Sequence, residues 1–330
     1  MKLYKLLQIQ SFFILFFGIG LSTAQVPSGY YSTAEGLTGE ALKAALNDII
    51  DDHVKFSYTS SNTDVWDILK ETDKDTIDPT KVILIYTGWT VDAAQEYNSG
   101  SGWTREHVWA KSRGNFGTSQ GAGTDVHALR PCDVSVNSAR NNRWFGIGEY
   151  EYIDGDGPTG CYTSTSSWVW EPRDEVKGDI ARMMFYMDTR YEGENGELDL
   201  QLIDFIPSDN NTNEPIHGLF SVLRQWHIDD PVDDWERNRN DVIYSYQGNR
   251  NPFIDHPEFV GKIWGHVLDE YEIGFKDEIV STSSLSKKQI ANSKELVMVV
   301  DALGREVEIK RGVLQFYIYS DGSVEKRVLR

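Results

Sequence analysis

Only two cysteines occur in the chain, Cys132 and Cys161, so at most one disulfide bond can cross-link the fold. A chain of 330 residues with so few cross-links depends on an ordinary hydrophobic core for its stability. Hydrophobic residues make up 40% and charged residues 25% of the sequence, which excludes a disordered or multi-spanning membrane chain. The sequence alone leaves open whether the two cysteines pair or remain separate buried thiols.

The N-terminus has the pattern of a signal peptide over residues 1–24. Lys2 and Lys5 precede an apolar stretch that is densest over 12–21, and small residues follow at 22–24. The apolar stretch is shorter than the roughly 20 residues that a membrane-spanning helix needs. We therefore expect cleavage and export, to the exterior, the cell surface or the periplasm, without stable membrane insertion.

Apolar periodicity and capping residues predict an α+β fold with several distinct elements. The Gly-, Ser- and Thr-rich stretch 146–167 is expected to be mostly loop. Methionine and aromatic positions on the helices are expected to lie in the core. The predicted elements are a helix over 40–53, a buried strand over 81–87, a helix capped by Asp174, and a helix capped by Asp230 that runs to about Tyr246.

A change in composition divides the chain near its C-terminal end. Residues 281–295 are rich in Ser and Lys at their start and are expected to be a linker. Residues 296–330 contain short β-branched runs separated by Gly-containing turns, a pattern that predicts four short strands. The expected organisation is therefore a main domain over 25–280, the linker, and a small all-β tail.

The charge is strongly acidic, with 32 Lys and Arg against 51 Asp and Glu and a net charge of −19. Such a balance argues against a protein that coats nucleic acid with its whole surface. The segment 105–143 is an exception, because it holds six basic and three acidic residues. We expect an anion site near this basic island, with binding that tolerates moderate salt.

Four residues in this segment have side chains that suit phosphodiester hydrolysis. Glu106 and His107 are adjacent, so they can serve one site only at a strand end or a bend, because neighbouring side chains on a strand point to opposite faces. Asn137 and Arg140, with Asn141, share one face of a helix. Carboxylate and amide oxygens are ligands for Mg²⁺ or Ca²⁺, imidazole accepts a proton, and guanidinium grips phosphate.

Four ordered motifs resemble the bacterial extracellular endonuclease I family, whose members are exported, non-specific nucleases with a ββα-metal active site. The resemblance covers about residues 30–265. The motifs are REHVW at 105–109, TDVHALRPCDVSVNSARNNR at 124–143, GDIARMMFYM at 178–187 and RNDVIYSYQGNRNPFIDHPE at 239–258. The resemblance implies an α+β fold of mixed helices and short sheets around that site.

The family pattern can be carried over residue by residue. Asp125 and His127 match an Asp-x-His motif and are expected to support the site from behind. Asn249 and Arg250 lie in a further motif, where packing and substrate contact are equally compatible with the sequence. The resemblance implies that His107 is the general base, that Glu106 and Asn137 are the metal ligands, and that Arg140 contacts phosphate.

This sequence departs from the family pattern in places. Periplasmic members have Val-Pro after the Glu-His pair, whereas this chain has Val108-Trp109-Ala110. The segment before the Asp-x-His motif is short here, so a phosphate-binding arginine found there in other members has no counterpart. The departures leave the base and the metal ligands intact.

The C-terminal tail has its own resemblance. The sequences VVDALGREV and GVLQFYIYSDGSVEKRVL resemble the sorting domain of type IX secretion substrates, although the usual Pro-Asn-Pro start is missing. That resemblance implies a partner in the secretion machinery. The alternative is a pair of terminal β-hairpins that belong to the main domain.

Together, these observations predict a secreted, monomeric endonuclease that uses Mg²⁺, with Mn²⁺ or Ca²⁺ as substitutes. It would hydrolyse DNA, and RNA as well, to 5′-phosphate and 3′-hydroxyl ends with little sequence preference. Two alternatives remain. One is a metal-dependent phosphodiesterase for small substrates, and the other is a non-catalytic exported protein that binds Ca²⁺ or glycans.

Overall fold

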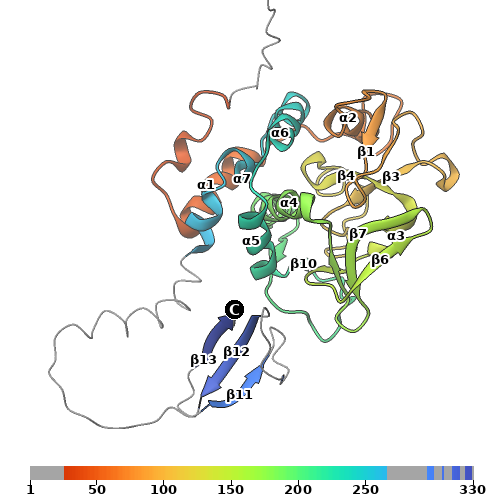
Figure 1. Cartoon of the computed structure of the whole chain (residues 1–330). Coiled ribbons are helices and arrows are strands. Elements are labelled where there is room, and N and C mark those ends of the chain that lie inside the picture. Colours follow the sequence, from red (N-terminus) through yellow and green to blue (C-terminus); the bar gives the residue numbers. More distant parts are fainter. Residues whose placement is uncertain (1–25, 266–295, 301–306, 308–313, 320–323, 329–330) are drawn as a thin grey trace, which may run out of the picture. The chain divides into compact units, whose positions relative to one another are not determined.

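A computed structural model describes residues 26–265, 296–300, 307, 314–319 and 324–328 of the chain (Figure 1). The chain separates into two compact units, Met1–Tyr271 and Glu272–Arg330. The predicted signal peptide and the predicted linker lie outside the described residues, so those boundaries stay predictions. No helix in the described ranges is long and apolar enough to cross a membrane.

The long helix α4 (Lys177–Arg190) is the centre of the first unit, with every residue after Lys177 buried. The short 3₁₀ turn η4 (Asp174–Val176) precedes it, so the helix starts three residues after the predicted cap, Asp174, whose side chain makes no capping hydrogen bond. The methionine-rich run of α4 fills the core, as its spacing predicts.

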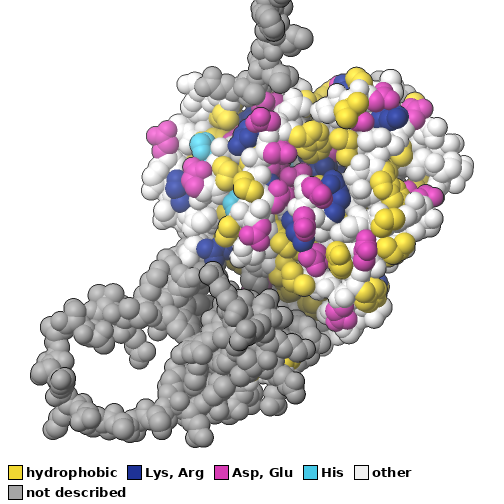
Figure 2. Space-filling view, in the orientation of Figure 1, with side chains coloured by type: hydrophobic (Ala, Val, Ile, Leu, Met, Phe, Trp, Pro, Cys, Tyr) yellow, Lys and Arg dark blue, Asp and Glu magenta, His cyan; other side chains and the backbone are white. Residues whose placement is uncertain are grey.

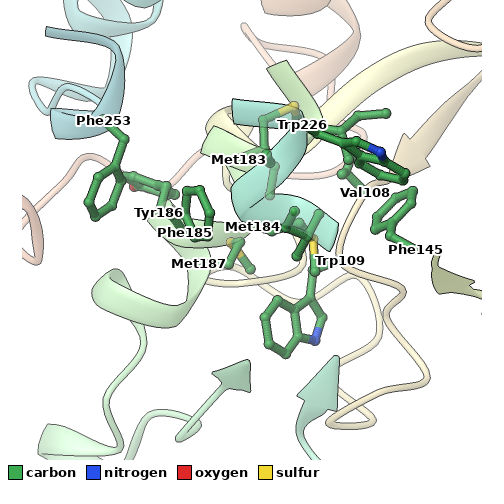
Figure 3. Close-up of a cluster of buried hydrophobic side chains, with 14 of the residues drawn as sticks. Val108, Trp109, Phe145, Met183, Met184, Phe185, Tyr186, Met187, Trp226 and Phe253 are labelled. Carbon is green, nitrogen blue, oxygen red and sulfur yellow. The ribbon is translucent and has the colours of Figure 1, made fainter. Parts of the chain in front are cut away.

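Figure 3 shows a part of this core that includes side chains of α4 and those of Val108 and Trp109. Phe185 on α4 packs edge-on against Phe253, with ring centroids 5.8 Å apart. On the other side, Val108 and Trp109 belong to the same buried cluster. These two residues directly follow His107, so the candidate site rests on the main hydrophobic core.

In Figure 1, α1, α5 and α7 lie on one side of α4, whereas α2 and α3 lie among the strands on the other side. Helix α2 has a full capping box, in which Asp64 accepts from the backbone of Trp66 and Asp67 while Asp67 accepts from Asp64. Helices α3, α6 and α7 also begin at a residue whose side chain accepts a hydrogen bond from the backbone. The labelled helices besides α4 are α1 (Gly39–Ile50), α2 (Val65–Thr72), α3 (Val134–Arg140), α5 (Phe220–Asp229), α6 (Asp234–Gln247) and α7 (Pro252–Asp255), and residues 259–265 are helical as well.

The strands of the first unit form small sheets. Three are two-stranded: β1 with β2, β3 with β4, and β9 with β10; the fourth has the order β5-β8-β7-β6. The mixture of helices and short sheets confirms the predicted α+β class. The strands are β1 (Lys81–Ile83), β2 (Thr90–Asp92), β3 (Trp103–His107), β4 (Leu129–Asp133), β5 (Trp144–Phe145), β6 (Tyr150–Asp154), β7 (Gly157–Ser164), β8 (Val169–Glu171), β9 (Gln201–Leu202) and β10 (Ile216–His217).

Three sequence predictions about these elements were inaccurate. The stretch 146–167 is not mostly loop, because β6 and β7 form an antiparallel hairpin across it. The predicted strand over 81–87 ends at Ile83, where the chain turns. Helix α6 is capped by Asp233 and not by Asp230, whose carboxylate instead accepts a hydrogen bond from the backbone of Gly178.

The described part of the tail contains β11 (Leu296–Val300), β12 (Leu314–Tyr319) and β13 (Val324–Val328). These strands form one antiparallel sheet in the order β11-β12-β13. The fourth predicted strand falls mostly on residues outside the described ranges. The role of this tail in secretion stays a prediction.

Candidate active site

Two antiparallel strands and a helix bring the predicted residues together. Strand β3 pairs with β4, with Glu106 opposite Arg130 and His107 opposite Leu129. Helix α3 follows β4 directly, because Asp133 caps it by accepting from the backbone of Ser135. Glu106 and His107 are thus the last two residues of β3, at the strand end that their adjacency requires.

A cleft of about 550 Å³ lies between this strand end and α3. Glu106, His107, Asn137 and Arg140 all line it. Asn141 lines it as well, although it ends α3 in a left-handed conformation with φ of 54°. The sequence therefore predicted the residues that meet in this cleft, whereas the roles assigned to them are not tested by their positions.

The Glu106 carboxylate is buried and held from two sides. Tyr86 donates its hydroxyl hydrogen to Glu106 Oε1 at 2.7 Å, and Arg140 Nη1 lies 3.2 Å from the same oxygen. Burial raises the pKa of Glu106, while the Arg140 charge and the Tyr86 hydrogen bond lower it in part. Both contacts use Oε1, so Oε2 is the oxygen left for a ligand.

The His107 imidazole is buried and oriented by a backbone carbonyl. Its Nε2 lies 3.0 Å from the carbonyl oxygen of Gly123. Because a carbonyl oxygen only accepts, Nε2 carries the proton and Nδ1 has the free lone pair. Burial lowers the pKa of His107 to about 4, so the ring is neutral at pH 7. The ring of Tyr58 stacks on it at a centroid distance of 5.7 Å.

Asn137 supplies the second oxygen of the cleft. It lies in the middle of α3 and is half-buried. Within the described part of the chain, its side-chain amide makes no hydrogen bond that meets ordinary distance and angle limits. The side-chain oxygen of Asn137, Oδ1, is therefore available to a ligand in the cleft, together with Glu106 Oε2.

Arg140 lines the cleft from the last residue of α3. Its guanidinium is buried, and it donates to the carbonyl oxygens of His107 at 3.2 Å and Val108 at 2.6 Å. A third contact is the ion pair with Glu106. These contacts tie the end of β3 to α3, and the predicted phosphate contact of Arg140 stays a prediction.

Asp125 and His127 lie outside the cleft and hold the segment that orients His107. Tyr186 and Tyr191 donate their hydroxyl hydrogens to Asp125 Oδ2 at 2.8 and 3.0 Å. Burial opposes ionisation of Asp125, but His53, His127 and the donated hydrogen bonds keep its pKa at about 2. Gly123, two residues earlier, carries the carbonyl that binds His107. The loop thus carries both Asp125 and the Gly123 carbonyl, and the supporting role of Asp125 and His127 stays a prediction.

The segment QGNRNP at 247–252 is held by contacts inside the fold. Asn249 donates to the carbonyl oxygen of Ile50 and to the Tyr186 hydroxyl. Arg250 forms ion pairs with Asp241 and Asp255. Neither Asn249 nor Arg250 lines the cleft. Of the two readings that the sequence left open, the structure favours packing at these positions.

The basic island of residues 105–143 is not an exposed basic surface, which corrects the expectation drawn from the sequence. Arg105, Arg113, Arg130 and Arg140 are buried, and Arg143 is half-buried. Arg130, for example, pairs with Asp73 at 2.5 Å. Only Lys111 is exposed. Figure 2 likewise shows acidic and basic side chains intermingled on one face of the molecule, without a basic patch.

Sequence reasoning missed three contributors to the site, namely Tyr58, Tyr86 and Gly123. Tyr58 and Tyr86 come from segments before β3, and no motif links them to Glu106 or His107. Gly123 contributes its backbone carbonyl oxygen. Every residue type has such an oxygen, so the sequence does not indicate this contact. The two cysteines are free, buried thiols, and the Cys161 thiol donates to the carbonyl oxygen of Tyr86.

A buried carboxylate, a neutral imidazole with one free nitrogen, and an amide oxygen in an open cleft are groups suited to hydrolysis. Comparison with known proteins identifies the family. The model of the Endonuclease I family matches residues 38–258. The chain belongs to the Endonuclease I family, as its motifs predicted, and it is a nuclease, a hydrolase that acts on nucleic acid.

Several relatives of the chain are nucleases by name. The extracellular ribonuclease of Bacillus subtilis (strain 168) is 52% identical over 238 residues, which cover 71% of this chain and 78% of the relative. The periplasmic deoxyribonuclease of Aeromonas hydrophila is 28% identical over 144 residues, 40% of this chain and 47% of the relative. Endonuclease-1 of Buchnera aphidicola subsp. Baizongia pistaciae is 25% identical over 132 residues, 40% of this chain and 46% of the relative.

Proposed function

We propose that the protein is an extracellular, Mg²⁺-dependent endonuclease that hydrolyses DNA and RNA with little sequence preference. It would leave 5′-phosphate and 3′-hydroxyl ends. The observation that carries the proposal is the meeting of Glu106, Asn137 and a neutral His107 in one cleft. The extracellular setting is supported by the predicted signal peptide and by the name of the Bacillus relative.

The oxygens in the cleft fit a hard divalent cation. Glu106 Oε2 and the Asn137 carbonyl oxygen are oxygen donors of the kind that Mg²⁺ binds, and Mg²⁺ keeps several water ligands when a protein offers only one or two side chains. No cluster of three or more His, Cys, Asp and Glu residues suited to a metal occurs in the described ranges. A site of one carboxylate and one amide is consistent with that finding.

Glu106 and Asn137 would hold the ion, and His107 would carry out the proton transfer. When bound, the ion supplies positive charge that stabilises the negative charge developing on the phosphate and on the leaving oxygen. His107 Nδ1 would take the proton from the attacking water, because Nε2 is already committed to Gly123. Arg140 and Tyr86 would keep the Glu106 carboxylate in place.

Low sequence specificity follows from the kind of group that the cleft presents. The side chains proposed to act on the scissile bond reach phosphate and water, and phosphate contacts carry no direct information about base identity. Relatives named as a ribonuclease and as a deoxyribonuclease support activity on both nucleic acids.

Plasmid cleavage by the purified protein tests the proposal. The parent should nick and linearise plasmid DNA with Mg²⁺, and EDTA should stop it. His107→Ala should lower the rate at least about 100-fold, because general-base catalysis contributes on that order. Cleavage that persists in His107→Ala would refute the assignment of the base. Activity confined to a small chromogenic phosphodiester would favour the phosphodiesterase alternative.

A further inference from the structure

An aromatic side chain stands exposed in the same cleft as Glu106 and His107. Tyr97 lines this cleft, and 52% of its surface is exposed. No aromatic ring or cation of the described residues stacks on its ring. Stacking of a flat ligand on a large aromatic side chain is favourable in free energy. An uncovered tyrosine beside a reaction centre is therefore a candidate contact for substrate.

The backbone around Tyr97 holds it in a tightly folded loop. Asn98, Ser99 and Gly100 follow with φ of 39°, 57° and 92°, three left-handed residues in succession. The amides of Gly100 and Gly102 both donate to the Tyr97 carbonyl oxygen, at 2.7 and 3.3 Å. Left-handed conformations at non-glycine residues cost free energy and persist only where neighbouring structure fixes them. The loop therefore presents Tyr97 from a defined position.

The other aromatic ring in the cleft is already occupied. The guanidinium of Arg105 lies 3.3 Å from the centroid of Tyr58, and His107 stacks on the same side chain. Tyr58 is thus committed to holding the catalytic end of β3. Of the two tyrosines that line the cleft, Tyr97 is the one with a ring available to substrate.

Exposed side-chain cations can provide little of the affinity for nucleic acid at this site. Lys111 is the single exposed cation among the residues that line the cleft, since the arginines there are buried. The chain as a whole carries a net charge of −19, which repels a polyanion. Contacts to uncharged parts of the substrate must therefore contribute, and the flat faces of the bases are the largest such surface.

We propose that Tyr97 is a stacking platform for an unpaired base beside the scissile phosphate, so that the enzyme prefers single-stranded nucleic acid over duplex. This inference rests on the proposed nuclease function. In a duplex, neighbouring base pairs cover both faces of each base, and a base must leave the stack before it reaches a side chain. Stacking accepts every base, so this preference for unpaired strands is compatible with low sequence specificity.

Three variants and four substrates test the inference. Tyr97→Ala removes the ring, Tyr97→Phe keeps it, and Tyr150→Ala removes an exposed tyrosine that does not line the cleft. The substrates are a 20-nucleotide DNA strand, the same sequence as RNA, its 20-base-pair DNA duplex, and an abasic strand that keeps the phosphates. The readout is kcat/KM for each pair of variant and substrate, with a denaturation midpoint to confirm folding.

Tyr97→Ala should lower kcat/KM about 5- to 100-fold on the DNA and RNA strands, the range expected for one lost stacking contact. On the duplex and on the abasic strand it should change kcat/KM less than about twofold, since neither offers a free base face. Tyr97→Phe and Tyr150→Ala should match the parent on all four substrates. A lower kcat/KM of Tyr97→Ala on the DNA strand alone, or on the RNA strand alone, would still support stacking, but only for that type of nucleic acid.

Two outcomes would overturn the inference. One is an equal loss on strand and duplex in Tyr97→Ala, which would indicate a general role in folding the loop. The other is no loss on any substrate. If the parent itself cleaves neither strand nor duplex with any divalent metal, the proposed nuclease function fails as a whole. A parent that cleaves both while Tyr97→Ala is unchanged rejects only the platform.

Discussion

At the scale of single residues, the site depends on groups that orient Glu106 and His107 rather than on those two alone. Tyr86 and Arg140 share Glu106 Oε1, and Gly123 fixes the tautomer of His107. The motifs of the sequence were sufficient to predict Glu106, His107 and Asn137 as cleft residues. They could not predict Tyr86 or Gly123, because one comes from a distant segment and the other acts through its backbone.

Tyr86→Phe should weaken metal binding while leaving the fold intact. The change removes one hydrogen bond to Glu106 Oε1 and keeps the ring, so the carboxylate loses part of its orientation. Losses of such supporting contacts cost roughly 10- to 100-fold in metal affinity or activity. A Mg²⁺ titration of the cleavage rate measures it, with Tyr152→Phe as the control because its hydroxyl binds Asp154 away from the cleft. An unchanged Mg²⁺ requirement would contradict this view of Tyr86.

At the scale of elements, the loop before β4 joins α4 to the site. Asp125 accepts hydrogen bonds from Tyr186 on α4 and from Gln247 at the end of α6. The same loop carries the Gly123 carbonyl. Packing of the helices and orientation of His107 are therefore connected through one buried carboxylate.

Asp125→Ala should lower both stability and activity. The substitution leaves several buried donors without an acceptor, and hydrogen bonds to a charged group are worth about 1.5–3 kcal/mol each. We expect a loss of at least about 3 kcal/mol in the free energy of unfolding, measured by urea denaturation. Asp156→Ala, at an exposed turn, is the matched control and should stay within about 0.5 kcal/mol of the parent.

The errors in predicting elements have a common physical origin. Asp230 and Asp233 are both suitable caps for α6, and only the tertiary contact of Asp230 with Gly178 decides between them. The hairpin of β6 and β7 resembled a loop in the sequence because it contains Gly and Pro residues, which are uncommon in strands, whereas its pairing is specified between strands. Helix α4 was predicted correctly because the helical spacing of its apolar residues matches the residues that are buried in the fold.

At the scale of the whole molecule, acidic charge governs the response to salt. Because few cations are exposed in the cleft, few counterions are displaced when nucleic acid binds. Each neutralised phosphate contributes about −0.7 to −0.9 to the slope of log affinity against log salt concentration. We expect a slope no steeper than about −2 for kcat/KM between 20 and 200 mM NaCl at fixed Mg²⁺. A steep, monotonic loss of rate would argue for a basic surface elsewhere in the chain.

Buried histidines should make the folded state sensitive to mild acid. Burial lowers the pKa of His127 to about 4, below the value near 6.5 of an unfolded chain. The unfolded state therefore binds the proton first, and stability that is present above pH 6.5 is lost as the pH falls toward 4. The histidines whose pKa is lowered in the folded state are His53, His107, His127, His217 and His227.

Urea denaturation at pH 7.5, 6 and 5 measures this dependence. His127 alone should cost about 2 kcal/mol at pH 5, from the difference between the two pKa values. His127→Gln should reduce the decrease between pH 7.5 and 5 by a similar amount, even if it lowers stability at every pH. Equal slopes for the variant and the parent would show that His127 titrates normally in the folded state.

The free thiols have a consequence for how the chain matures. Cys132 and Cys161 are buried, and burial raises the pKa of the Cys161 thiol to about 12, so its reactive thiolate is scarce at neutral pH. A protein whose two cysteines stay free has no disulfide bond to form and needs no oxidant or disulfide isomerase in order to fold. Folding then depends entirely on non-covalent contacts. We therefore expect the same active fold to form in a reducing cytosol, in a buffer with a reductant, and in the extracellular medium.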